Sequence, residues 1–153
     1  MSMSIELREI KLLSNEITPL VIEAESEGHR FVRRLQDDWD EGKNRFQGTG
    51  EFLLSVYLDG TLTALGGLNK DPYLNTEGIG RLRHVYVSPS VRHQGIGGLL
   101  VNRIIEQAAQ TFLILRLRTT TTGAATFYEK LGFERTNEDA ATHILHLRAQ
   151  SRL

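Results

Sequence analysis

The residues with the clearest chemical potential lie where an apolar strand leads into a basic, glycine-rich loop. Val85 and Val87 belong to the end of the strand, Arg92 opens the loop, and Gly95 and Gly97 stand where an amphipathic helix begins. Glycines let backbone N–H groups approach a ligand closely, and the N-terminal end of a helix favours an anion. The pattern therefore predicts a binding site for a small molecule that carries phosphate.

Two other kinds of phosphate loop fit this stretch less well. A dinucleotide fingerprint needs a third glycine, and Leu100 occupies its place. A nucleoside triphosphate loop ends in Gly-Lys-Ser/Thr, which this loop lacks. A pyrophosphate of the acyl-CoA type remains the favoured ligand, with a nucleotide on the same loop as an alternative.

Two segments together carry a resemblance to a known family. The run Arg92-His93-Gln94-Gly95-Ile96-Gly97 resembles the Arg/Gln-x-x-Gly-x-Gly/Ala loop of the GNAT superfamily of N-acetyltransferases. Further along, the run from Ala124 to Phe133, Ala-Ala-Thr-Phe-Tyr-Glu-Lys-Leu-Gly-Phe, is similar to the second signature of that family. Both runs follow an apolar strand, and they occur in the family's order.

The resemblance implies that acetyl-CoA is the cofactor. Its pantetheine arm would pair with the backbone of the strand before the loop, and the loop amides would hold its pyrophosphate. Several amides at a helix start, with Arg92 beside them, bind such a group without a metal, so no metal is expected. The expected cofactor-binding residues are Val85, Tyr86, Val87, Arg92, His93, Gln94, Gly95, Ile96, Gly97, Gly98, Thr121, Ala124 and Phe127. Relatives often have asparagine at the position of Thr121.

Tyr128, inside the second signature, is the expected catalytic residue. When an amine attacks a thioester, the leaving thiolate has a pKa of about 8.5, whereas a phenol has a pKa of about 10. The phenol therefore suits donation of a hydrogen bond to the leaving sulfur, with proton donation as the limiting form. The alternative is an aromatic side chain that packs beside Phe127.

A general base is harder to assign. An alkylammonium of pKa about 10.4 must lose a proton before it attacks. Relatives commonly carry Glu or His at the positions of Arg81 and Arg83, and arginine stays protonated. Strand alternation predicts that His84 faces the opposite side of the sheet. Glu51, Glu77 and a chain of waters remain as alternatives.

Arg81 and Arg83 also bear on the acceptor. If they face the acceptor pocket, they favour a carboxylate or a phosphate on the acceptor. The alternative is a solvated or salt-bridged pair. The first two predicted helices and the loop at 69–80 are expected to form this pocket.

These residues require a strand–helix–strand unit within a larger sheet. Strands are predicted at 5–12, 52–58, 62–68, 79–87, 112–117, from 133, and at 142–147, and helices at 17–27, 29–39, 95 to about 109, and 123–131. Asp59-Gly60 predicts a hairpin turn, and Gly66-Gly67 a bulge or a close backbone approach. The unit at 85–117 should be parallel and right-handed. We therefore expect a single α/β domain at 1–153, with a mixed, mostly antiparallel sheet of six or seven strands flanked by about four helices.

Composition limits the functional class. The chain has 153 residues, a formal net charge of −1 and no cysteine, which excludes disulfides and thiolate chemistry. Neither nucleic acid nor a membrane is an expected partner, and we expect a cytoplasmic monomer or homodimer. The predicted function is direct transfer of an acetyl group from acetyl-CoA to a primary amine of a small molecule or peptide. The alternative is a CoA-binding sensor without transfer activity.

Overall fold

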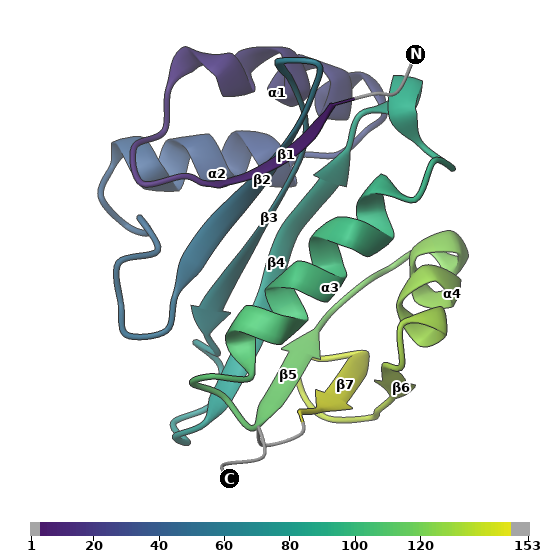
Figure 1. The fold of residues 1–153 in the computed structure, drawn as a ribbon. Coiled ribbons are helices and arrows are strands. Elements are labelled where there is room, and N and C mark those ends of the chain that lie inside the picture. Colours follow the sequence, from purple (N-terminus) through teal and green to yellow (C-terminus); the bar gives the residue numbers. More distant parts are fainter. Residues whose placement is uncertain (1–3, 148–153) are drawn as a thin grey trace, which may run out of the picture.

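A seven-stranded mixed sheet organises the chain, whose computed structural model describes residues 4–147 (Figure 1). The strands lie in the order β1-β2-β3-β4-β5-β7-β6; β4 and β5 pair in parallel, and the other neighbouring pairs are antiparallel. The predicted sheet type and the parallel unit are confirmed. The strands are β1 Ile5–Glu9, β2 Phe52–Leu58, β3 Thr61–Lys70, β4 Ile79–Val87, β5 Ile114–Leu117, β6 Glu134–Arg135 and β7 His143–His146.

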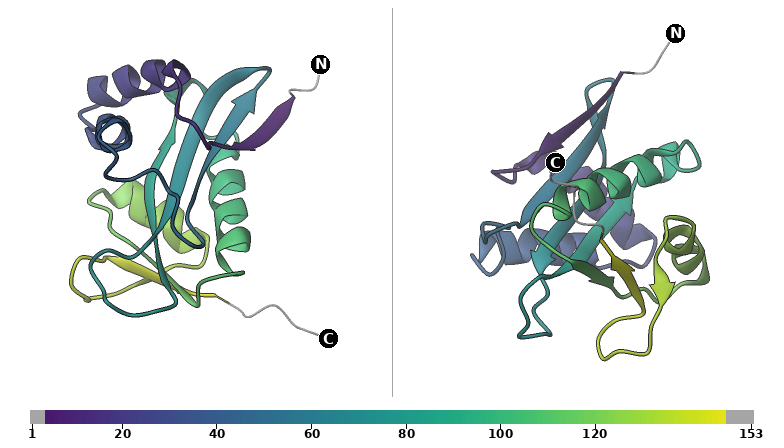
Figure 2. Two further views of the ribbon diagram at one scale, coloured as in Figure 1. Left: turned by 90° about the vertical axis from the view of Figure 1, so that its left-hand side faces the viewer. Right: turned by 60° about the horizontal axis from the view of Figure 1, so that its bottom comes forward.

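Helices cover both faces of the sheet. They are α1 Thr18–Ser26, α2 Phe31–Asp40, α3 Ile96–Ala108 and α4 Thr122–Lys130, with 3₁₀ turns at Asn15–Ile17 and Pro89–Val91. Figure 2 shows α1 and α2 on one side of the sheet and α3 on the other. Each side has its own apolar cluster, because the helices place buried residues at helical spacing: Val32, Leu35 and Trp39 on α2, and Leu100 and Ile104 on α3.

Local sequence signals fix most of the boundaries. Asp59 and Gly60 both have positive φ, as the predicted two-residue hairpin turn requires. Strand β1 is shorter than predicted, because Glu9 pairs with Leu54 and its partner strand begins only two residues before that. The strand predicted from 133 is reduced to the two residues of β6.

The predicted irregularity at Gly66-Gly67 is confirmed, and it changes the direction of β4. Gly67 pairs with Arg83 and Leu65 with Tyr86, so two residues of β4 lie opposite Gly66 alone. His84 is the first of these two and has a φ of +60°. From this bulge onward the alternation of β4 is shifted by one residue.

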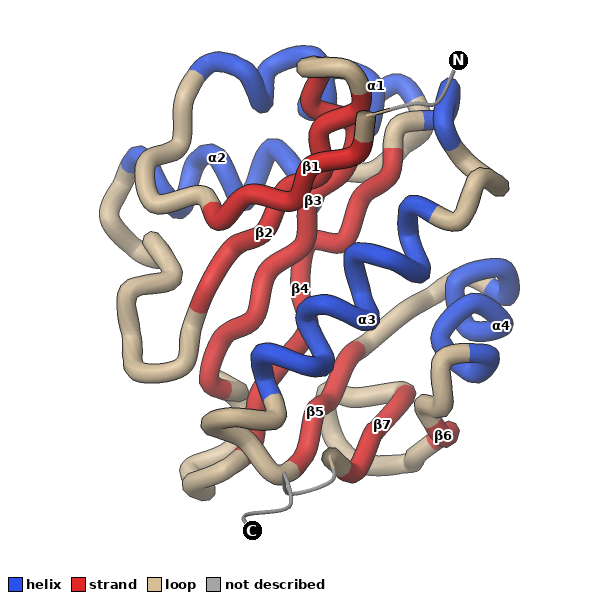
Figure 3. The backbone as a smooth tube through the Cα atoms, in the orientation of Figure 1, coloured by secondary structure: helices blue, strands red, loops and turns tan. Residues whose placement is uncertain are grey.

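Strand β4 separates from β5 after a short pairing. The two strands pair over Ile79–Arg81 and Ile114–Arg116, and no β5 partner is assigned to β4 from Leu82 to Val87. Figure 3 shows the coil after β5 leading away from β4 towards α4. The carboxyl half of β4 therefore borders a gap in the sheet.

Candidate active site

Part of the main chain of β4 faces this gap. The N–H of Ser88 donates to the carbonyl of Thr63 on β3 at 2.8 Å. By alternation, the main-chain groups of Val85 and Val87 point away from β3, towards the gap. The carbonyl of Val87 already accepts a hydrogen bond from Nε of Arg92 at 2.9 Å.

The start of α3 leaves several amides without partners in the helix. Gly95 precedes the helix with a φ of +82°, where glycine carries no steric penalty, and no side chain caps this end. The first helical hydrogen bond runs from Leu99 N–H to the carbonyl of Gly95, at 3.0 Å. A Cβ at Gly95 or Gly98 would have no atom within 4 Å beyond its chain neighbours and the backbone of α3 itself. This helix end is therefore open to an anion.

Arg92, which is expected to add a cation beside the loop, is paired with a carboxylate in the structure. Its guanidinium binds both carboxylate oxygens of Glu27, at 2.6 and 2.7 Å, and lies over the ring of Tyr86. The Tyr86 hydroxyl donates to the same carboxylate at 2.8 Å. Hydrogen bonding from Arg92 lowers the pKa of Glu27, so the carboxylate stays charged and neutralises the arginine. The side chain of Arg92 thus anchors the loop to the end of α1.

Tyr128 lies at the packed side of α4. Its ring makes edge contacts with Phe127 and Phe133, at centroid distances of 5.0 and 5.6 Å. Burial raises the pKa of the phenol, which keeps it protonated at neutral pH. Its hydroxyl has no hydrogen bond to any of residues 4–147. Phe127 reaches within 3.3 Å of the position that a Cβ at Gly97 would take, so α4 packs beside the start of α3.

Thr121 has a structural partner. Its Oγ1 accepts a hydrogen bond from the N–H of Ala124 at 3.2 Å and caps α4. Threonine is a favoured capping residue, so the sequence contained this signal.

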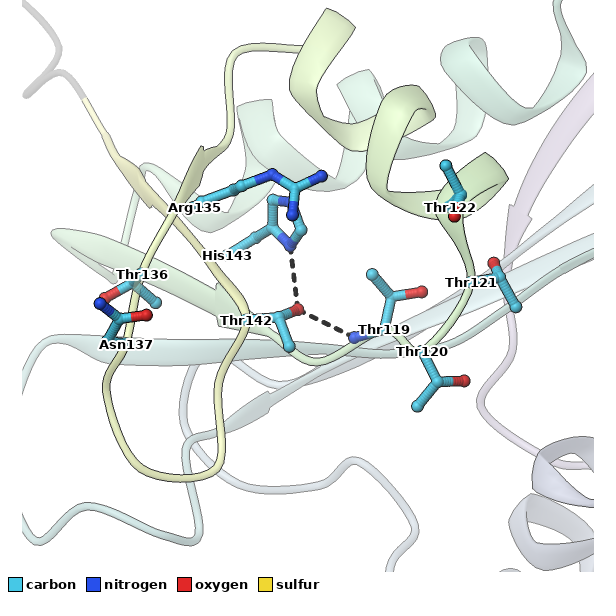
Figure 4. Close-up of a pocket in the computed structure, with 9 residues that line it drawn as sticks. All are labelled: Thr119, Thr120, Thr121, Thr122, Arg135, Thr136, Asn137, Thr142 and His143. Carbon is cyan, nitrogen blue, oxygen red and sulfur yellow. Dashed lines mark hydrogen bonds between the residues drawn. The ribbon is translucent and has the colours of Figure 1, made fainter.

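A polar pocket of about 310 Å³ lies beside the connection from β5 to α4 (Figure 4). In it, Oγ1 of Thr142 accepts from the N–H of Thr119 at 3.0 Å and bonds Nδ1 of His143 at 2.9 Å. Nε2 of His143 lies 2.8 Å from Glu129. Because these residues come from three distant segments, sequence analysis missed this network. It ties β7 to α4.

The expectation that Arg81 faces an acceptor also needs correction. Arg81 is buried and lies 3.5 Å from the carboxylate of Asp71, which Arg116 approaches equally closely from β5. The ring of Tyr73 covers its guanidinium at 4.6 Å. Sequence analysis missed Asp71 and Arg116, because the pairing of β4 with β5 brings them together. Arg81 therefore holds the strands together.

Arg83 and His84 lie on the same face of β4, contrary to the predicted alternation. Arg83 reaches Oδ1 of Asn69 at 3.4 Å, on the side of the sheet that α2 covers. The bulge turns His84 to this side too, where Nδ1 lies 3.0 Å from the Phe31 carbonyl and the ring packs edge-on against Phe46. Burial, with the positive charge of Arg83, lowers the pKa of His84 to about 4.

The two glutamates considered as bases are engaged elsewhere. Glu51 accepts hydrogen bonds from the N–H groups of Gly48 and Lys70 and from Nδ2 of Asn69. Glu77 is exposed and pairs with Lys70 at 3.2 Å. Both side chains hold loop segments in place.

Comparison with known proteins decides the family. The sequence model of the Acetyltransferase (GNAT) family matches residues 11–133 of the chain. The chain belongs to this family. Both signature segments lie within the match, and proteins of the GNAT family use an acyl-CoA cofactor.

Solved structures of GNAT proteins share the fold over nearly the whole chain. A candidate acetyltransferase from Exiguobacterium sp. 255-15 is 29% identical with a TM-score of 0.83, over 94% of this chain and 93% of that one. A GNAT-family acetyltransferase from Staphylococcus aureus Mu50 is 18% identical with a TM-score of 0.74, over 95% and 100%. Ard1 from Thermoplasma volcanium is 18% identical with a TM-score of 0.69, over 94% and 98%. At the lower identities the likeness concerns the fold. None of the helices within 4–147 has the length and apolar character needed to cross a membrane.

Proposed function

We propose that this protein is an N-acyltransferase that moves an acetyl group from acetyl-CoA to a primary amine. The observation that carries the proposal is the convergence of three features at one gap in the sheet. They are the uncapped start of α3, the edge of β4 that has no β5 partner after Arg81, and helix α4, which packs beside the start of α3 and carries Tyr128. An extended cofactor with a diphosphate in its middle and a thioester at its end matches this arrangement.

The residues have distinct roles in this proposal. Backbone amides from His93 to Gly98 hold the diphosphate, and the main chain of Val85 and Val87 pairs with the pantetheine arm. Thr121, Ala124 and Phe127 border the arm from the other side of the gap. The amine attacks the thioester carbon directly, since the chain has no cysteine to carry the acyl group. Tyr128 donates a hydrogen bond to the leaving sulfur.

A CoA-binding sensor without transfer activity is the second candidate. Strand β4 carries arginine where relatives carry a base, and Glu51 and Glu77 are engaged in loops. Release of free CoA during incubation with acetyl-CoA and a broad amine panel separates the two functions. Release that depends on an amine supports transfer, and binding without release on any amine supports the sensor.

Binding itself is tested by thermal unfolding. Acetyl-CoA at a hundred times its Kd should stabilise the protein by about 2.7 kcal/mol, or roughly 5–10 °C for a chain of this size. No shift at millimolar acetyl-CoA would contradict both candidates.

A charge at Gly98 tests the placement of the diphosphate. Aspartate in the first turn of a helix is tolerated, and nothing in the described chain would touch its Cβ. Gly98→Asp should therefore unfold at the wild-type temperature, yet bind acetyl-CoA roughly 10- to 100-fold more weakly by calorimetry, through repulsion of the diphosphate. Gly98→Ala controls for size, and Asn102→Asp places the same charge one turn along α3. If Gly98→Asp and Asn102→Asp bind acetyl-CoA with equal affinity, the diphosphate does not bind beside Gly98.

A further inference from the structure

The face of β4 that α2 covers holds a buried ring nitrogen without a hydrogen-bond partner and two guanidinium groups without a carboxylate partner in the described chain. Nε2 of His84 is buried and has no hydrogen-bond partner among the described residues. Arg83 beside it and Arg34 on α2 have no carboxylate within salt-bridge distance in the described chain. A buried acceptor atom without a donor destabilises the free protein, so a ligand that offers an N–H there gains binding energy.

The hydrogen bonding of His84 fixes where its lone pair lies. A carbonyl oxygen accepts only, so Nδ1 must carry the proton that bonds the Phe31 carbonyl at 3.0 Å. In the neutral imidazole, Nε2 then carries the lone pair. The lowered pKa of His84 keeps the ring neutral at pH 7. Nε2 is therefore a proton acceptor in the resting protein.

Two cations act on this imidazole from two elements. Arg83 from β4 and Arg34 from α2 are the charged groups whose positive charge lowers the pKa of His84. The neighbouring Arg33 differs, because its guanidinium binds Glu25 at 2.8 and 3.0 Å. The uncompensated charges of Arg83 and Arg34 thus lie on the His84 side and favour an anion there.

The arrangement of the helices on the sheet favours binding of an acceptor on this same face. Helix α3 and its apolar cluster cover the opposite face of β4, and the open end of α3 is assigned to the diphosphate (Figure 2). The bulge places His84 in the part of β4 that has left β5 and borders the gap. The side chains of Arg83 and His84 thus lie on the face of β4 that α3 does not cover.

We propose that the acceptor is an amine that also carries a carboxylate or phosphate, whose anionic group binds between Arg83 and Arg34 and whose amine gives its proton to Nε2 of His84. The inference rests on the proposed function. The ammonium group first releases one proton to solvent. The amine nitrogen then bonds to the acyl carbon while a second proton moves from nitrogen to Nε2 of His84, and the C–S bond breaks with its electron pair on sulfur. The thiolate takes a proton from water or from Tyr128, which then regains one from solvent, and His84 releases its own proton to solvent. The products are the amide and CoA.

Binding of the anion also prepares the base. Burial is the largest cause of the lowered pKa of His84, and the positive charges of Arg83 and Arg34 add to it. A negative group between the two arginines offsets the part that comes from their charges. The imidazole then becomes more basic only when the correct acceptor is present. Through this coupling the anion should raise turnover as well as affinity.

Matched acceptor pairs test the substrate class. Each pair keeps the amine and removes the anion: 4-aminobutyrate against butylamine, α-amino acids against their decarboxylated amines, and O-phosphoethanolamine against ethanolamine. With acetyl-CoA saturating, kcat/KM should be at least tenfold higher for the anionic member of the carboxylate pairs or of the phosphate pair. The pairs that show this preference identify the anion as a carboxylate or a phosphate. Equal or lower kcat/KM for every anionic member, with turnover of neutral amines, would overturn the inference and leave acyl transfer intact.

Variants on α2 and β4 locate the anion site. Arg83→Gln and Arg34→Gln should each reduce the preference within a pair by about tenfold or more, while acetyl-CoA affinity stays unchanged. Arg33→Gln, one position away and paired with Glu25, should leave the preference unchanged. If all three variants lose the preference for the anionic acceptor to the same extent, Arg83 and Arg34 do not form a specific anion site.

His84→Asn tests the proton acceptor with little disturbance of the fold. Asparagine tolerates positive φ, and its amide replaces Nδ1 as donor to the Phe31 carbonyl. We expect kcat to fall roughly 10²-fold or more, with acetyl-CoA affinity and unfolding temperature close to those of the wild type. The acidic limb of the kcat/KM profile should disappear. An unchanged profile with full turnover would exclude His84 from proton transfer.

If no amine in the panel is acetylated, a direct measurement of amine binding still tests the inference. The ring proton signals of His84 should shift in NMR spectra when an anionic amine is added to the CoA complex, and its pKa should rise. Normal acetyl-CoA binding together with unmoved His84 signals for every anionic amine would overturn the inference alone. Failure to bind acetyl-CoA would instead overturn the proposed function on which it rests.

Discussion

At the scale of single residues, burial sets the protonation states that the chemistry needs. Desolvation raises the pKa of Tyr128 and lowers that of His84, so the phenol is protonated and the imidazole neutral at pH 7. One side chain can donate a proton and the other can accept one. In the proposed mechanism, Tyr128 is therefore the acid and His84 the base at neutral pH.

Tyr128→Phe should separate chemistry from binding. The hydroxyl has no partner among residues 4–147, so its removal should leave unfolding temperature and acetyl-CoA affinity unchanged. Turnover should fall roughly 10²-fold, because the leaving sulfur loses a hydrogen-bond donor. Single-turnover kinetics measures this step directly. Wild-type rates of acyl transfer would remove Tyr128 from the mechanism.

His84 should make stability depend on pH in the mildly acidic range. Its pKa is about 4 in the folded protein and 6.5 ordinarily, so the unfolded chain binds a proton more readily. The free energy of unfolding should therefore fall as pH drops from about 6.5 to about 4, by about 3 kcal/mol in all. Urea unfolding at a series of pH values measures the slope. In His84→Asn this part of the slope should vanish; the same slope in both proteins would mean that other groups cause it.

At the scale of elements, the bulge in β4 decides which side chains meet. It forms opposite Gly66 and turns His84 to the face that Arg83 occupies. Next to it, Gly67 lets the ring of Phe46 pack directly on the backbone of β3: a Cβ there would lie 2.5 and 2.8 Å from two ring carbons. Two adjacent glycines thus permit both the bulge and the packing of the α2 layer.

Gly67→Ala should destabilise the protein by about 1–3 kcal/mol, because the Phe46 ring must move within a packed core. The same change in a Phe46→Leu background should cost clearly less, since the smaller side chain leaves room. Urea unfolding of all four proteins gives the coupling free energy. Gly98→Ala, in open space, serves as the control for added methyl groups. A coupling near zero would show that the clash is not the cause.

At the scale of the whole molecule, one buried carboxylate links three segments of the sheet. Asp71 follows β3, Arg81 lies on β4 and Arg116 on β5, and all three side chains are buried. The cluster sits at the short parallel pairing of β4 with β5, just before the strands separate. The cluster therefore stabilises the end of the sheet where β4 and β5 remain paired.

Asp71→Asn should be strongly destabilising, since two buried guanidinium groups would lose their carboxylate. The expected loss is about 3–5 kcal/mol in free energy of unfolding, measured by urea or thermal denaturation. Glu77→Gln, which removes an exposed ion pair in the same loop, should have no measurable effect. Similar small changes in both variants would mean that the cluster does not stabilise the sheet.

The sequence alone determined the parts of this protein that depend on local patterns. Apolar periodicity located the helices and strands, Asp59-Gly60 located the hairpin, and Gly95-x-Gly97 located the open helix end. These features need only neighbouring residues, whose backbone preferences and spacing act at short range.

The tertiary structure alone decided the partners of the charged side chains and of His84. Glu27 neutralises Arg92 from a distant helix, and Asp71 binds Arg81 through strand pairing. The bulge shifts the alternation of β4, so His84 and Arg83 share a face although they are neighbours in sequence. Such contacts depend on strand register and on packing between layers, which bring distant residues together and which no local pattern specifies.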